Sequence, residues 1–239
     1  MKQGDVVYEH LREDIVEMRL APGSVLNEVE LTERLSVSRT PLREAIQRLA
    51  REGLVHTTHG RGTTVAEISL DDVVKLVQMR EALEPYAARL CARRSNRSVF
   101  EGLRVELEQC RNDLYAGAVE DKYEGYYELI TRFDDALAEG ADNHYLAAAL
   151  LELRGHLYRL RRLARRRPDR MVATTDEHLA ICNAICEGDE VLAVQAASVH
   201  IHNSFRNILA ALMENVVGPG LLGPLPPTVT DQLDQVDDG

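Results

Sequence analysis

Long apolar runs are missing from this chain of 239 residues. No stretch approaches the roughly 18 consecutive apolar residues that a membrane-spanning helix needs. The first residues, Met1–Leu11, are polar and mixed in charge, so they do not resemble a secretory signal. These absences predict a cytoplasmic protein with no membrane partner, and the hydrophobic content of 45% is sufficient for a folded core.

Cysteine and recognisable catalytic motifs are also scarce. The four cysteines lack the paired spacing of a metal site, and a reduced cytoplasm fits them best: Cys91, Cys110, Cys182 and Cys186. The chain has no Ser-His-Asp pattern, no Gly-rich phosphate loop and no HExxH motif, so we do not expect an enzyme. The alternative is a metal-dependent helical-bundle enzyme fused to a nucleic-acid-binding module. It would need Glu-x-x-His pairs, and the nearest match, Glu152 with His156, has the wrong spacing.

Basic residues are outnumbered by acidic ones, with 28 Lys and Arg against 39 Asp and Glu. The net charge of −11 argues against a protein that coats nucleic acid indiscriminately. Residues 34–61 are the exception, because they hold six arginines against two glutamates. A local excess of positive charge in an acidic chain indicates a specialised surface.

That basic segment has the pattern of a recognition helix. Arg39 and Arg43 lie four residues apart on one face of the expected helix. Another face is apolar, with the helical spacing of Leu42, Ala45, Ile46 and Leu49. Ser38 or Thr40 can cap its first turn. Two helical patterns precede it, at 6–18 and 29–35. Two β-rich stretches, 54–58 and 63–66, flank a basic turn at 59–62. We therefore predict three helices and a β-hairpin wing, a winged helix-turn-helix.

The sequence changes character near residues 67–71. We expect domain 1–68 to be the DNA-binding module, domain 69–216 to be an antiparallel all-α bundle of about six helices, and 217–239 to be a disordered tail rich in Pro, Gly and Asp. The fold class is thus mostly α. The expected bundle helices are 70–95, 98–116, 119–139, 144–166, 171–187 and 189–215.

Taken together, these motifs resemble the GntR-type bacterial transcription regulators, in the FadR-like branch with an all-helical FCD effector domain. The resemblance spans about residues 5–215 and rests on the following segments: Leu26–Leu31, Val37–Ala45, Leu49–Leu54, Gly60–Gly62, Arg80–Glu84, Phe133, Glu177–His178 and His200–Ile201. It implies a homodimeric, ligand-responsive repressor or activator that binds palindromic operator DNA.

The resemblance also implies roles for particular residues of the first domain. Arg39 and Arg43 would contact bases or phosphates, and Ser38 and Thr40 would help to anchor the DNA backbone. The wing tip would enter the minor groove with His59, Gly60 and the basic Arg61. Dimerisation follows physically, because one module covers few base pairs and two related by a dyad contact half-sites about one helical turn apart.

Three residues of the bundle form a candidate metal site. His178 and His200 lie 22 residues apart on consecutive expected helices, and Asp134 falls among core positions. Two imidazoles and a carboxylate suit Zn²⁺ or Ni²⁺. The family typically has Asp and His at two positions that are Ile130 and Asp134 here, so one ligand is lost and another is changed. Two alternatives stay open: a three-ligand metal site, or a metal-free pocket with hydrogen-bonded histidines.

Arg80 and Asn203 are the candidate effector-binding residues. The guanidinium of Arg80 can bind an effector carboxylate, or it can pair with Glu84 one turn later. Asn203 shares a helical stripe with His200 and indicates a polar cavity beside the packing face. The arginine-rich run between Arg159 and Arg170 is either a second basic site or a solvated helix end.

Overall fold

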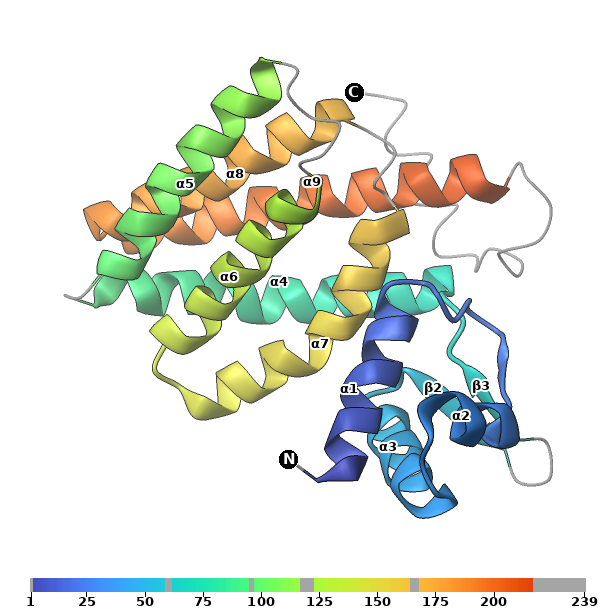
Figure 1. Cartoon of the computed structure of the whole chain (residues 1–239). Helices are drawn as coiled ribbons and strands as arrows, with labels where there is room; N and C mark the ends of the chain where they lie inside the picture. Colours follow the sequence, from blue (N-terminus) through green and yellow to red (C-terminus); the bar gives the residue numbers. More distant parts are fainter. Residues whose placement is uncertain (1, 59–61, 95–96, 117–122, 164–167, 217–239) are drawn as a thin grey trace. The chain divides into compact units, whose positions relative to one another are not determined.

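The computed structural model describes residues 2–58, 62–94, 97–116, 123–163 and 168–216. These residues divide into two compact units. The first comprises the chain up to Val73 together with Arg154–Arg162, and the second comprises Val74–Leu153 and residues 163–216. Within the described residues there are nine helices and three short strands, so the prediction of a mostly α fold is confirmed (Figure 1).

The three predicted N-terminal helices are present as α1 (Gln3–Val16), α2 (Glu28–Leu35) and α3 (Arg39–Arg51). Their apolar faces form one core, in which the side chains of Leu11, Ile15, Leu42 and Leu49 are all completely buried. Asn27 caps α2, as its Oδ1 accepts a hydrogen bond of 3.0 Å from the backbone N–H of Val29. Helix α3 is therefore held by its apolar face, and its opposite face is left to solvent.

The predicted wing is a β-hairpin of β2 (Val55–Thr58) and β3 (Gly62–Val65). The two strands pair antiparallel, with Val55 opposite Val65 and Thr58 opposite Gly62. A strand that the sequence did not reveal, β1 (Val25–Leu26), pairs with the other side of β3, so the sheet order is β1-β3-β2. The wing thus supplies the central strand, β3, and one edge strand, β2, of a three-stranded sheet.

The second unit is built from long helices, and the bundle prediction is confirmed in number and order. Their bounds are α4 (Leu70–Arg93), α5 (Ser98–Tyr115), α6 (Tyr123–Gly140), α7 (His144–Leu163), α8 (Pro168–Glu187) and α9 (Glu190–Val216). One segment of the fourth of these helices, Arg154–Arg162, belongs to the first unit. Helix α8 begins at Pro168, three residues before the expected start. Proline is favourable in the first turn, where its missing N–H costs no helical hydrogen bond.

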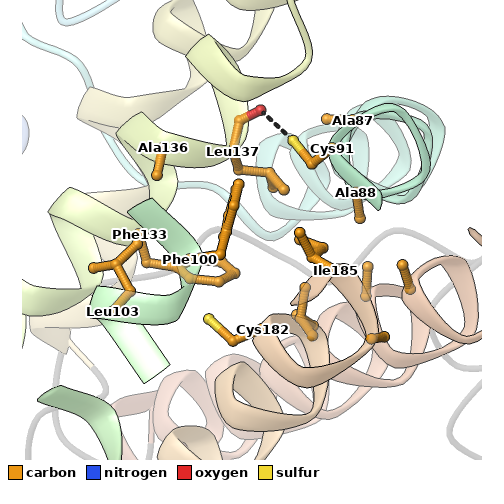
Figure 2. Close-up of a cluster of buried hydrophobic side chains, with 14 of the residues drawn as sticks. Ala87, Ala88, Cys91, Phe100, Leu103, Phe133, Ala136, Leu137, Cys182 and Ile185 are labelled. Atoms are coloured by element: carbon orange, nitrogen blue, oxygen red, sulfur yellow. Dashed lines mark hydrogen bonds between the residues drawn. The ribbon is translucent and has the colours of Figure 1, made fainter. Parts of the chain in front are cut away.

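A single apolar cluster joins the helices of this unit. Figure 2 shows Phe100 of α5 and Phe133 of α6 close to Cys182 and Ile185 of α8. The thiol of Cys91 on α4 donates a hydrogen bond of 3.5 Å to the carbonyl of Leu137 (Figure 2). This packing fixes the mutual positions of α4, α8 and α9, which carry the polar residues considered below. None of the helices in the described part of the chain is long and apolar enough to span a membrane.

Candidate nucleic-acid interface and polar cluster

The predicted DNA-contacting residues at the start of α3 form one exposed surface. Ser38 occupies the N-cap position, and its side chain makes no capping hydrogen bond. Ser38, Arg39, Thr40 and Arg43 are all exposed. We call these four residues the α3 surface. Its cations and hydroxyls stand at the N-terminus of a helix, where backbone N–H groups also favour anions such as phosphate.

Arg43 has one acidic neighbour. Its Nε donates a hydrogen bond of 3.1 Å to Oε2 of Glu28 at the start of α2. The Arg43 side chain is 62% exposed and that of Glu28 is 34% exposed, so solvent screens this ion pair strongly. Such pairs are worth about 0–1 kcal/mol. The guanidinium is therefore only weakly paired and remains available to a stronger anionic partner.

Another arginine of the same helix faces the opposite way. The guanidinium of Arg48 lies 3.6 Å from the ring centroid of Tyr8 and donates a hydrogen bond of 2.9 Å to Asp5, both on α1. Arg48 is thus occupied in holding α1 against α3. Position on the helix, and not residue type, separates the two roles.

The predicted DNA-contacting surface also includes the wing tip. His59, Gly60 and Arg61 lie outside the described residues. The strands that carry the tip are described, and β2 exposes three successive residues from His56 to Thr58. The proposed entry of the tip into the minor groove stays a prediction.

In the second unit, charged and polar side chains of α4, α8 and α9 converge. We call the following group the polar cluster: Arg80, Glu84, Arg170, Glu177, His178, His200, Asn203 and Ser204. Arg80 is 1% exposed, His178 is 1% exposed and His200 is 4% exposed. Polar groups this deep must be hydrogen-bonded, and a charged group such as the Arg80 guanidinium must also be paired.

Arg80 is paired with Glu84. Its Nε and Nη2 donate hydrogen bonds of 2.6 and 3.0 Å to the two carboxylate oxygens of Glu84. Nη1 donates to the hydroxyl of Ser204 at 3.3 Å, and Nη2 lies 3.4 Å from Nε2 of His200. Of the two alternatives for Arg80, the ion pair with Glu84 is therefore present. Its effector role stays a prediction.

Glu177 is the centre of the other half of the cluster. Its carboxylate accepts hydrogen bonds of 2.6 and 2.8 Å from Arg170, of 2.9 Å from His200 Nδ1 and of 2.9 Å from Asn203 Nδ2. Burial raises its pKa, but the donors from His200 and Arg170 outweigh burial and lower the pKa of Glu177 to about 2. Glu177 is therefore ionised at neutral pH.

The two histidines meet as predicted, and each ring is held by its Nδ1. The ring centroids of His178 and His200 lie 4.4 Å apart, and His178 also packs edge-on against Phe133. Nδ1 of His178 lies 2.7 Å from the carbonyl of Thr174, and Nδ1 of His200 bonds Glu177. Burial lowers the pKa of His200 despite the adjacent Glu177 carboxylate, so we take the ring as neutral, with Nε2 carrying a lone pair.

The residues present do not fit the predicted metal site. Within the described residues, no group of three or more His, Cys, Asp or Glu side chains is gathered so that it could hold a metal ion. Asp134 on α6 is partly exposed and does not complete such a group with His178 and His200. Ile130, at the position where the family pattern has a ligand, is 1% exposed in the apolar core. A bound zinc or nickel ion stays a prediction without support from this geometry.

Arg170 and Glu177 belong to this cluster, although the sequence does not predict either of them as an effector or metal residue. Arg170 lies at the end of the arginine-rich run, yet its side chain is only 18% exposed and pairs with Glu177. A signal was available, because Arg170, Thr174 and Glu177 follow the i, i+4, i+7 spacing of one helix face, next to His178. Charged residues at that spacing beside a histidine indicate a buried pair when the neighbouring helices offer polar partners.

Comparison with known proteins agrees with both halves of the structure. Residues 3–65 match the family "Bacterial regulatory proteins, gntR family", and residues 75–203 match the FCD domain. An HTH-type transcriptional regulator of Streptomyces ambofaciens is 30% identical over 203 residues, which cover 84% of this chain and 83% of the relative. The HTH-type transcriptional repressor RspR of Escherichia coli is 29% identical over 209 residues, covering 87% and 90% of the two chains.

The fold is shared with solved structures at low sequence identity. The structure of E. coli McbR/YncC superposes with a TM-score of 0.71 at 18% identity, covering 90% of this chain and 99% of that one. A GntR regulator structure from Rhodococcus gives a TM-score of 0.69 at 20% identity, covering 88% and 99%. These two structures therefore share the fold of this chain over most of its length. The chain belongs to the GntR family of bacterial transcription regulators, in the FadR-like branch with an FCD domain, and it is a DNA-binding regulator and not an enzyme.

Proposed function

We propose that this regulator binds a palindromic operator as a homodimer and represses transcription from it. The observation that carries the proposal is the exposed pair Arg39 and Arg43 at the N-terminus of α3, inside the GntR module. Two relatives support repression by their names, RspR and a probable D-xylose utilization operon repressor of Paenarthrobacter nicotinovorans, which is 29% identical. Operator DNA places such a protein in the cytoplasm.

The homodimer follows from the size of the reading surface. One α3 inserted in a major groove contacts only a few base pairs, which is too little information to select one operator. Two copies related by a dyad contact two half-sites about one helical turn apart, and this doubles the sequence that is specified. Light scattering of the free chain and of its operator complex measures this directly.

We also propose that a small-molecule effector with a carboxylate group acts at the polar cluster. The cluster offers the donors that bind a carboxylate: guanidinium groups of Arg80 and Arg170, imidazoles, and the amide of Asn203. In the structure these donors bind the chain's own carboxylates, Glu84 and Glu177. An effector carboxylate would have to exchange with one of them, and that exchange would shift the positions of α4, α8 and α9. The effect on DNA affinity cannot exceed the difference in effector affinity between the two states.

Operator binding is tested by Arg43→Ala against a site selected from random double-stranded DNA. We expect a loss of affinity of roughly 10- to 100-fold by fluorescence anisotropy, as a bidentate base contact is worth about 1–3 kcal/mol. Arg51→Ala, at the exposed C-terminal end of α3, is the matched control because it removes the same charge from the same helix. Equal operator affinity for Arg43→Ala and wild type at moderate salt would refute the proposed role of α3.

Effector binding is tested by thermal unfolding in a panel of carboxylic acids. A ligand of the cluster should raise the Tm of the wild type, lower operator affinity, and lose both effects in Asn203→Ala. His202→Ala is the control, since this residue is one position away on α9 and exposed. A carboxylate that shifts Tm equally in both variants binds elsewhere and contradicts the assignment.

A further inference from the structure

We propose that the polar cluster works without a metal ion, and that the Arg80 guanidinium occupies the place in front of His200 that a metal would need. This inference rests on the proposed effector role of the cluster, which it refines by removing the cofactor from it.

The imidazole nitrogens are the first feature. A ligand histidine typically donates one ring N–H to a carbonyl or carboxylate and turns its other nitrogen to the metal. His178 and His200 both have the first half of this arrangement, through Thr174 and Glu177. The second half differs, since Nε2 of His200 lies 3.4 Å from a guanidinium nitrogen of Arg80. Because Arg80 can only donate, the lone pair of His200 already faces a cation.

Arg80 is fixed in that place by its own partners. Both carboxylate oxygens of Glu84 accept from it, and Ser204 accepts from its remaining nitrogen. The side chain is also fully buried. A metal at Nε2 of His200 would have to displace a bidentate ion pair, and not merely water.

The number of ligands is the second feature. A protein site for zinc or nickel needs at least three side-chain ligands. The family pattern is broken at Ile130, which is buried among apolar residues. Asp134 does not form a three-ligand group with the two histidines among the residues that the structure describes. Two imidazoles alone are too few.

Charge balance is the third feature. The ionised groups of the cluster cancel, as Arg80 and Arg170 stand against Glu84 and Glu177. A divalent cation would add two positive charges next to Arg80 in a buried setting, where charges interact more strongly than in water. The cluster therefore has the cations it needs, supplied by the chain itself.

The experiment measures metal in the full-length protein after dialysis against a chelator and then after addition of Zn²⁺ or Ni²⁺. We expect no metal that depends on His178 or His200, and a Tm that neither chelator nor metal changes. A metal bound to the folded state at a concentration well above its Kd would raise Tm by several degrees. One equivalent per chain that is lost in both His178→Ala and His200→Ala, but kept in His202→Ala, would overturn the proposal. Metal that persists in both variants lies elsewhere on the chain and leaves the proposal standing.

A second measurement needs no variant and so survives if the histidine variants do not fold. Long-range ¹H–¹⁵N NMR of the wild type reports the tautomer of each imidazole. We expect His200 as the neutral Nδ1–H tautomer, with spectra of His178 and His200 unchanged by Zn²⁺. A shift of either Nε2 on addition of one equivalent of Zn²⁺ would contradict the inference. Operator affinity measured in chelator tests the proposed function separately, because α3 contains no cluster residue.

Discussion

The α3 surface and the polar cluster both contain arginines, but the arginines of the two regions differ in burial and in partners. Arg39 and Arg43 are exposed. Arg43 forms an ion pair with Glu28, and solvent screens this pair. Arg80 is buried, and its N–H groups bind Glu84 and Ser204 and face His200. An arginine available for DNA costs the free protein little when it is removed, whereas an arginine inside the cluster holds other buried charges in balance. Stability and DNA affinity should therefore respond to different arginines.

The largest effect is expected for Arg80→Ala. Removing one partner of a buried ion pair leaves Glu84 unbalanced, which costs about 3–5 kcal/mol in the free energy of unfolding. Urea denaturation measures this loss, and Arg39→Ala should change stability by less than about 0.5 kcal/mol. Replacing both partners, as Arg80→Met with Glu84→Leu, should recover much of the loss because no charge is then stranded. Equal stability of Arg80→Ala and Arg39→Ala would erase the distinction between the two regions.

The next effect is on DNA. Arg39→Ala should weaken operator binding by about 1–3 kcal/mol if the side chain contacts a base, and should lower the salt dependence if it contacts a phosphate. Anisotropy titrations at several salt concentrations separate these outcomes. Operator affinity that is unchanged at every salt concentration would show that Arg39 does not contact the DNA.

Arg48→Ala sharpens the comparison within a single helix. Loss of the contact with Tyr8 and the ion pair with Asp5 should cost about 1 kcal/mol of stability. Operator affinity should stay within about twofold of wild type, because the side chain faces α1. A strong loss of affinity with unchanged stability would mean that Arg48 leaves α1 to contact DNA.

The smallest effect is expected for Glu28→Gln. This change removes the carboxylate that pairs with Arg43 and would also repel phosphate. Operator binding should tighten by a few-fold at low salt, in line with the 0.2–1 kcal/mol typical of exposed pairs, and the gain should fade at high salt. Weaker binding would show that Glu28 positions Arg43 for the DNA.

These contrasts also explain which parts of the protein could be predicted from the sequence. The helices were predictable because their apolar spacing is local, as in Leu42, Ala45, Ile46 and Leu49 of α3. Strand β1 was not, since two residues have no period and pair only through the distant β3. The exposed arginines followed from their helix face and from the family resemblance.

The polar cluster was only half predictable. The pairing of Arg80 with Glu84 is local, at i, i+4, and was one of two alternatives. The contacts of Glu177 join α8 to α9 through His200 and Asn203, 23 and 26 residues along the chain. Which buried carboxylate serves which donor depends on the packing of three helices, and no spacing rule within one helix contains that information.

The thiol of Cys91 can report how often the helical bundle opens locally. It is 2% exposed, hydrogen-bonded to Leu137, and burial raises its pKa to about 12, so the reactive thiolate is almost absent in the closed bundle (Figure 2). An alkylating reagent can reach it only during transient openings of the contact between α4 and α6. The labelling rate of Cys91 therefore measures how often this contact opens. A ligand that stabilises the bundle should lower the labelling rate in proportion to that stabilisation.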